Sequence, residues 1–553
     1  MRKPRLLAAS AMSLALALTI AGCGGGDSGS GDGGATGGGA GNPDGALAIY
    51  GTEPENPLVP GNTTESGGSK VTRALWTGLT TYDPATGDST NAMAESIETT
   101  DSKVFTIKIK SGWKFHDGTE VKAKNFVDAW NHTAYSPNAS QGASFFAQVQ
   151  GYDDVHATDP DGAAGPQKAP EPKAKEMSGL KVVDDTTFEI TLSAPFSVFP
   201  IKFGYNPFYP LPDAFFADQK KFEANPVGNG PFKFVSRKPN DNVTLTRFDD
   251  YKGDDKPKFK DLTFKIFETN EAAYTAVVSG ELDFIETVPP SGIAGAKYKE
   301  DMPERNGTTP FLGNQTLAFP LYDPKWASPD LRKAISLAIN REEIVAKIYD
   351  NTKPVADGWV NAATPGYAKG QCGELCKFDP VKAKEYLAKS GFTGTIELTA
   401  NADGGHKDWM TATCNSIKNA LGLECNYVPI PTFAETRQKV NARQMTAIYR
   451  TGWVADYPSI ENFLNPIHHT GGSSNDGGYS NPTFDALLAR ADSAPSVDEA
   501  NKLYQEAERI LAVDMPVIPL WDQTTQYVWS DKADNVRLNT LRELDLTTVT
   551  VKQ

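Results

Sequence analysis

The chain has 553 residues, of which 39% are hydrophobic, 22% charged and 10% aromatic, and its formal net charge is −15. This length corresponds to three or four domain-sized units, and the acidic balance argues against nucleic acid or anionic lipid as a direct partner. A mean hydropathy of −0.42 excludes a protein with many membrane-spanning helices.

The first 22 residues have the pattern of an export signal. Three basic residues open the chain, the apolar stretch 6–20 follows, and small residues lead directly to Cys23. That stretch is shorter than the roughly 20 residues that a membrane-spanning helix needs. Residues 20–23, Ile-Ala-Gly-Cys, resemble the bacterial lipobox, whose cysteine is lipidated after cleavage. We therefore expect the loss of residues 1–22, which lowers the net charge from −15 to −18, and a lipid on Cys23. An ordinary secretory signal that is cleaved near Ala21 is the alternative.

Residues 23–45 predict a flexible tether. Of the 49 glycines in the chain, 12 lie within residues 24–45, among Ser, Asp, Ala and Thr. Such a coil has almost nothing to bury and reaches roughly 25 Å on average. It would hold a soluble body near a membrane without embedding it.

The body alternates strand and helix patterns. Apolar residues at every second place predict a strand over 104–110, and a helical pattern follows at 123–131. Leu331 to Ile339 keeps the spacing of an amphipathic helix, and Asn340 with Glu343 predicts the cap of the next one. Further strands are predicted at 180–183, 187–192, 396–399 and 446–449, and further helices near 380–390, 409–421 and 484–513. This succession predicts a mixed α/β fold.

Four cysteines of the body fit an exported protein. Cys372 and Cys376 are four residues apart, and Cys414 and Cys425 are eleven apart. Three pairings are possible, of which the local one is the simplest. Zinc would need closer pairs or interleaved histidines, so we expect disulfides in an oxidising compartment.

Eight segments, in order along the chain, carry a resemblance to a known family. From about residue 46 to 545 the chain resembles the extracellular solute-binding proteins of peptide-type ABC importers, the oligopeptide- and dipeptide-binding class, and within it the actinobacterial lipoproteins. The segments are Leu75–Asp83, Met93–Ser96, Lys114–Thr119, Pro226–Phe232, Gly280–Asp283, Leu331–Arg341, Phe378–Pro380 and Met515–Trp521.

The resemblance implies an α/β fold of the periplasmic-binding-protein type II, in which hinged lobes carry an extra domain. Its three domains are interleaved along the chain. Domain I would comprise 46–76, 213–314 and 522–553, domain II 77–212, and domain III 315–521. A ligand that contacts both lobes would shift the molecule towards a closed state.

The resemblance also suggests ligand-binding residues. In the segment Arg450–Pro458, Asp456 matches an aspartate that meets the α-amino group of a peptide, and Arg450 an arginine that meets carboxylate or backbone. Trp453 could stack against the ligand, and Glu65 lies near the position of a glutamate that faces a ligand side chain. The alternatives are structural: Asp456 as a turn or helix cap, Arg450 in a surface ion pair and Trp453 in the core.

Enzymatic motifs are missing from the body. Its six histidines form no H-E-x-x-H, and it has no G-x-S-x-G. We expect no cofactor and no metal, and we expect His468 and His469 to be solvated loop residues. The expected partners are an oligopeptide and the permease of an ABC importer, for a monomer that is lipid-anchored on the outer face of the cytoplasmic membrane. Another solute (a nickel chelate, haem, a sugar or an opine) and a secreted hydrolase remain the alternatives.

Overall fold

A computed structural model describes residues 41–157, 169–254 and 256–553 of the chain. The predicted signal segment, Cys23 and most of the tether therefore lie outside the described residues. Residues 41–45, which precede the expected start of domain I, pack with the same compact unit as the body. The reason is visible in two backbone bonds: Asn42 N–H donates to the Val551 carbonyl at 2.7 Å, and the Gly45 carbonyl accepts from Lys260 N–H at 2.9 Å.

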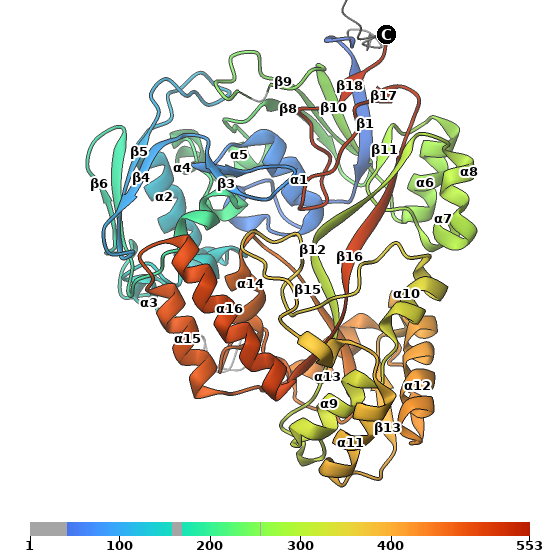
Figure 1. Cartoon of the computed structure of the whole chain (residues 1–553). Coiled ribbons are helices and arrows are strands. Elements are labelled where there is room, and N and C mark those ends of the chain that lie inside the picture. The colour runs from blue at the N-terminus through green and yellow to red at the C-terminus, as the bar shows by residue number, and fades with distance from the viewer. Residues whose placement is uncertain (1–40, 158–168, 255) are drawn as a thin grey trace, which may run out of the picture. The chain divides into compact units, whose positions relative to one another are not determined.

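Ten strands form the main sheet (Figure 1). They are β1 (Ala46–Gly51), β8 (Phe232–Lys238), β9 (Asn242–Arg247), β10 (Asp261–Ile266), β11 (Phe284–Ile285), β12 (Asn306–Ala318), β13 (Ile396–Thr399), β14 (Cys425–Tyr427), β15 (Ile448–Val454) and β16 (Val517–Trp529). Their order in the sheet is β14-β13-β15-β12-β16-β11-β1-β10-β9-β8, with both parallel and antiparallel pairs.

The two longest strands, β12 and β16, lie in the middle of the sheet and connect its two halves. β12 and β16 pair antiparallel and lie side by side, with register shifts between Pro310 and Asn314 and between Gln315 and Thr316 (Figure 1). β13, β14 and β15 lie beyond β12, and β1 with β8 to β11 lies beyond β16. The predicted borders between domains I and III, at 314/315 and 521/522, fall on residues that face each other across this pair.

Smaller sheets lie outside the main one. β4 (Ala94–Thr99), β5 (Val104–Ile109), β7 (Thr187–Thr191) and β6 (Leu180–Val182) form a four-stranded sheet in that order. β2 (Thr80–Tyr82) pairs with β3 (Ser89–Asn91), and β17 (Ala533–Asp534) pairs with β18 (Thr550–Val551). In β5 the buried residues are Phe105, Ile107 and Ile109, which is the alternation that predicted a strand here.

The helices cover these sheets. Those of nine or more residues are α1 (Ser66–Leu75), α2 (Ala123–Ala134), α6 (Asn270–Ser279), α9 (Pro329–Leu337), α10 (Arg341–Tyr349), α11 (Pro380–Ser390), α12 (Lys407–Leu421), α13 (Phe433–Asn441), α14 (Ile460–His468), α15 (Pro482–Asp492) and α16 (Val497–Asp514). The short ones are α3 (Tyr152–Val155), α4 (Asp213–Ala217), α5 (Gln219–Ala224), α7 (Pro290–Ile293) and α8 (Lys297–Asp301). Among the described residues, none of these helices has the length and apolar character that crossing a bilayer requires.

Local sequence explains several of these boundaries. Asn340 caps α10 as predicted, because its Oδ1 accepts from Glu343 N–H at 3.2 Å. Ser496 caps α16 in the same way, and Pro495 precedes it, so the predicted helical region 484–513 is divided into α15 and α16. Cys372 pairs with Cys376 and Cys414 with Cys425, which confirms the local pairing; the second disulfide ties α12 to the edge strand β14.

An aromatic core lies beneath the four-stranded sheet. The ring of Trp130 on α2 contacts five phenylalanines: Phe126, Phe146, Phe188, Phe203 and Phe208. Two of them belong to the segment 199–209, which begins with the 3-10 helix Phe199–Gly204. This packing fixes the backbone that carries Lys202 and Tyr205, two residues that matter for the site.

Candidate functional site

The segment that carries the predicted site residues runs from β15 into α14. The structure extends β15 to Val454, whereas the sequence predicted a strand over 446–449. Its pairing with β12 sets Arg450 opposite Leu317 and Trp453 opposite Asn314. Asp456 follows in the turn between β15 and α14, so all three lie on one continuous piece of chain.

Arg450 is a largely buried guanidinium without an acidic partner. Its Nε donates to Gln315 Oε1 at 3.4 Å, and no carboxylate of the described residues lies within ion-pairing distance. Burial lowers the pKa of Arg450 from its usual value, and the nearby Tyr349 opposes that shift. The expected alternative, a surface ion pair, is therefore not what the structure has.

Lys353 lies beside the same tyrosine, and sequence reasoning missed it. Its ammonium is 5.2 Å from the centroid of the Tyr349 ring and donates to Gln523 Oε1 at 2.7 Å. Burial lowers the pKa of Lys353 to about 8. Among the described residues, no carboxylate pairs with Arg450 or with Lys353 within 4 Å.

Asp456 is a largely buried carboxylate without a basic partner. Its Oδ2 accepts from Asn462 Nδ2 at 3.3 Å, and no cation of the described residues lies within ion-pairing distance. Burial raises the pKa of Asp456, while the bond from Asn462 and the charge of Lys202 oppose that rise. Its charge also acts on the phenols of Tyr82 and Tyr205, which belong to the part of the chain around the smaller sheets.

Asn462 connects Asp456 with Trp453, a connection that the sequence did not reveal. Its Oδ1 accepts from Asp456 N–H at 3.0 Å and from the Trp453 indole N–H at 2.9 Å, while its Nδ2 donates to Asp456. Asn462 is only 2% exposed. A buried amide on the first turn of a helix that follows an aspartate was the available signal.

Glu65 stands apart from this group. It caps α1: both carboxylate oxygens accept from Gly68 N–H, at 2.8 and 2.9 Å, and Oε1 also accepts from Glu55 N–H at 3.3 Å. No contact joins it to Arg450, Trp453 or Asp456, and its role towards a ligand stays a prediction.

His468 corrects one expectation. It is the last residue of α14, is 3% exposed and packs against Tyr479 and Phe484, so it is not a solvated loop residue. Burial lowers its pKa to about 3. The helix continues through Pro466 to His468, and the aromatic packing that buries the imidazole comes from residues further along the chain.

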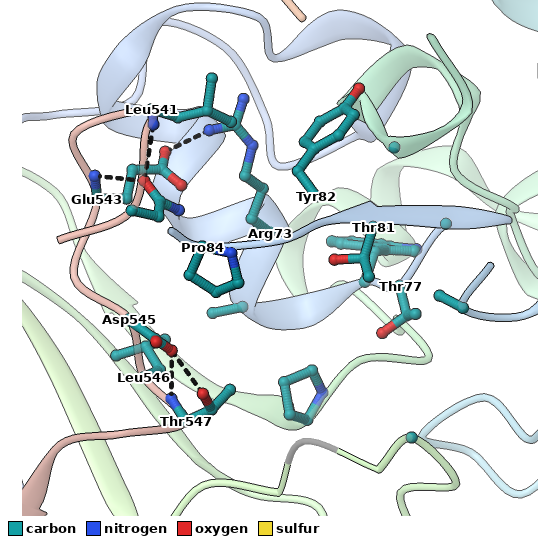
Figure 2. A pocket seen from close by; sticks show the side chains of 18 of the residues that line it. Arg73, Thr77, Thr81, Tyr82, Pro84, Leu541, Glu543, Asp545, Leu546 and Thr547 are labelled. Carbon is teal, nitrogen blue, oxygen red and sulfur yellow. Dashed lines mark hydrogen bonds and ion pairs between the residues drawn. The ribbon is translucent and has the colours of Figure 1, made fainter. Parts of the chain in front are cut away.

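Two cavities adjoin this region. One of about 180 Å³ is lined by Arg450 and Trp453, together with Asn314, Trp359 and Arg437, and Arg437 is paired with Asp476 at 2.6 Å. A larger cavity of about 530 Å³ lies between α1, the β2–β3 hairpin and residues 539–547. Figure 2 shows it with Arg73 paired to Glu543 and Tyr82 at its wall. None of the predicted site residues lines the larger cavity, so the candidate site lies at the smaller one and at Asp456.

Comparisons with known proteins agree with the fold. Residues 89–475 match the family model of bacterial extracellular solute-binding proteins, family 5, middle. The periplasmic oligopeptide-binding protein OppA of Salmonella typhimurium is 28% identical over 503 residues, covering 86% of this chain and 88% of OppA.

Solved structures share the whole described architecture. The unliganded open form of the periplasmic murein tripeptide binding protein MppA superposes with a TM-score of 0.77 at 22% identity, covering 92% of this chain and 97% of MppA. Haemophilus influenzae OppA in complex with RPPGFSPFR gives 0.70 at 21% identity, covering 93% and 100%. The described residues therefore have the α/β fold of type II periplasmic binding proteins, as expected.

Proposed function

Because this chain belongs to family 5 of the bacterial extracellular solute-binding proteins, we propose that it is the substrate-binding lipoprotein of an ABC importer. It captures oligopeptides and delivers them to the membrane permease, and it performs no chemistry on them. The relative OppA is named for binding oligopeptides, and MppA for binding a murein tripeptide. These names support peptides as the class of solute.

The observation that carries the proposal is a pair of unmatched charges on one segment. Asp456 and Arg450 are both largely buried, and neither has an oppositely charged partner within ion-pairing distance among the described residues. Leaving a buried charge unpaired is costly, so such groups favour a ligand that supplies the partner. An unblocked peptide brings an ammonium for Asp456 and a carboxylate for Arg450 and Lys353.

The spacing of these groups suits an extended peptide. From Arg450 the chain runs along β15 to Val454 and then turns to Asp456. At about 3.3 Å per residue, this path is as long as a few residues of extended ligand. Charge-assisted hydrogen bonds at both ends would fix what all peptides share, which allows tolerance of their side chains.

Binding and delivery would use the division into three domains. We place the hinge where β12 and β16 cross between domains I and III, because the register shifts there interrupt regular pairing. Domain II, which carries Tyr82 and Tyr205, would face Asp456 of domain III. The lipid on Cys23 and the glycine-rich tether would keep the monomer beside its permease.

The experiment is native mass spectrometry of the protein after incubation with a library of unblocked oligopeptides. Intact, retained peptides are expected, and the same library with acetylated amino ends and amidated carboxyl ends should be retained far less. Cleaved peptides would show a hydrolase instead. Retention of a non-peptide compound from the source cells, with no peptide bound, would show that the solute is of another class.

A further inference from the structure

Behind Asp456 lies a cluster of acids that shares one cation. Glu461 on α14 is 4% exposed, and its Oε2 accepts from the Tyr457 hydroxyl at 2.6 Å. Asp492, the last residue of α15, accepts from the Tyr504 hydroxyl of α16 at 2.5 Å. The cation is Lys202, which belongs to the segment beside the four-stranded sheet and is 3% exposed.

Lys202 reaches this cluster from the 3-10 helix Phe199–Gly204, whereas the three acids belong to the part of the chain around α14 and α15. Its ammonium lies 5.3 Å from the ring centroid of Tyr457, 5.0 Å from that of Phe196 and 5.9 Å from that of Phe199. Its hydrogen-bond acceptor is Gln148 Oε1 at 3.2 Å, and none of the three acids is within ion-pairing distance of it. The charge of Lys202 is therefore shared among Asp456, Glu461 and Asp492 and belongs to none of them.

Hydrogen bonds to two backbone carbonyls join the end of α15 to the part of the chain around the four-stranded sheet. Ser197 N–H donates to the Asp492 carbonyl at 2.8 Å, and the Ser102 hydroxyl donates to the Ala494 carbonyl at 2.9 Å. The segment just before Lys202 and the end of α15 are thus held together, so the place of Lys202 near Asp492 does not depend on long, mobile side chains at a surface.

The charges of this cluster do not balance. Three carboxylates face one ammonium, and the other titratable groups packed on them are the phenols of Tyr457 and Tyr504, with Tyr82 and Tyr205 near Asp456. A buried cluster with a surplus of acids lowers its free energy by keeping a proton. Burial, with the charge of Glu461 adding to it, raises the pKa of Asp492 to about 7, while the hydrogen bond from Tyr504 and the charge of Lys202 oppose that rise, so we assign the proton to Asp492.

We infer that Lys202 and Asp492 couple peptide binding at Asp456 to the release of a proton. The inference rests on the proposed function and adds a regulation to that same site. When the ammonium of a peptide pairs with Asp456, the charge of Lys202 becomes available to Glu461 and Asp492. The Asp492 carboxyl then gives its proton to the solvent and stays as a carboxylate.

The sign of the pH dependence follows from linkage. The carboxyl is protonated in the free protein below a pH of about 7 and ionised in the complex, so affinity is highest above that pH and falls as the pH drops through it. Between pH 7 and pH 6, one such group weakens binding by up to about fivefold. The peptide's own α-amino group has a pKa near 7.7–8.0 and stays mostly charged in this window.

The test is calorimetric titration with tri-, tetra- and penta-alanine at pH 6.0 and 7.0, each in phosphate and in imidazole. These buffers differ in ionisation enthalpy, so the heat difference counts released protons. The wild type should release about half a proton at pH 7 and lose affinity towards pH 6. Asp492→Asn should abolish both effects, whereas the control Asp498→Asn, on the exposed first turn of α16, should keep them.

Lys202→Met provides a second reading. It should greatly reduce both the proton release and the loss of affinity towards pH 6, because the charge that connects Asp456 with Asp492 is gone, and the exposed control Lys238→Met should keep both effects. Peptide binding without proton release in the wild type would overturn the inference but leave the proposed function standing. A release that persists in Asp492→Asn would also overturn it, and failure of all three peptides to bind would overturn both.

Discussion

The side chain of Asn462 does more for the candidate site than its place inside α14 suggests. One amide satisfies the Trp453 indole N–H and the Asp456 backbone N–H and donates to the Asp456 carboxylate. Both candidate ligand contacts thereby have a fixed position relative to each other. A binding site is accurate only when the residues behind the contacting groups are themselves held in place.

Replacing Asn462 by Ala should therefore affect stability and binding together. Two part-buried donors lose their acceptor, at a cost of about 1–3 kcal/mol in the free energy of unfolding. Peptide affinity should fall by more than about tenfold, since Asp456 and Trp453 lose their common support. Urea unfolding and calorimetry measure the two quantities.

The matched control is Asn465→Ala, one turn further along α14 and only half-buried. It should change neither quantity by a comparable amount. Asn462→Asp keeps the acceptor but replaces the donor to Asp456 by a second carboxylate, so it should weaken binding most at high pH. Unchanged affinity in both Asn462 variants would remove its positioning role.

At the scale of elements, the contact between β15 and β12 holds Arg450 and Trp453 in register. Gly452 lies between them, and a Cβ there would be 2.5 Å from the Asn314 carbonyl oxygen. That oxygen is backbone, so it cannot rotate away, and either strand would have to move. A residue without a side chain is therefore required at this point of the sheet.

Gly452→Ala should accordingly push β15 away from β12. We expect the free energy of unfolding to fall by about 1–3 kcal/mol and peptide affinity to fall with it. Val454→Ala, at a position that is 61% exposed on the same strand, should stay within about 0.5 kcal/mol of the wild type. Equal stabilities of the two variants in urea unfolding would contradict the close approach of the strands.

At the scale of the whole molecule, the chain combines a predicted membrane address with a solute-binding body. Cys23→Ser should leave the body folded but move the protein from the membrane fraction to the surrounding medium. Cell fractionation measures where the protein is, and incorporation of a labelled fatty acid measures the lipid on Cys23. An unlabelled wild type, or a Cys23→Ser variant that stays at the membrane, would contradict the lipid anchor.

Much of the fold could be predicted from the sequence, because its local signals agree with the final structure. The strand over 396–399 was predicted with its observed bounds, and the helix near 380–390 in its observed place, since Asp379-Pro380 marks the start of that helix. Asn340 was predicted as a helix cap because Glu343 follows it three residues later. The strand with Arg450 was predicted too short, because its extension depends on pairing with β12, over 130 residues earlier.

The candidate site could be predicted only in part. Asp456, Arg450 and Trp453 were found through a resemblance, and the structure puts them on one segment without testing their roles. Lys353, Asn462 and Lys202 were missed because their significance arises from contacts between distant parts of the chain. His468 was misjudged since a helix through Pro466 is stabilised by packing that the local sequence does not reveal.

Crossing one variant with one change of ligand tests whether Asp456 binds the α-amino group of a peptide. Calorimetry would compare the wild type and Asp456→Asn with a retained peptide and with its N-acetylated form. We expect the variant to bind the free peptide more than about tenfold more weakly, about 1.4 kcal/mol, and both proteins to bind the acetylated peptide equally. An equal loss with both peptides, or no loss with the free one, would contradict it.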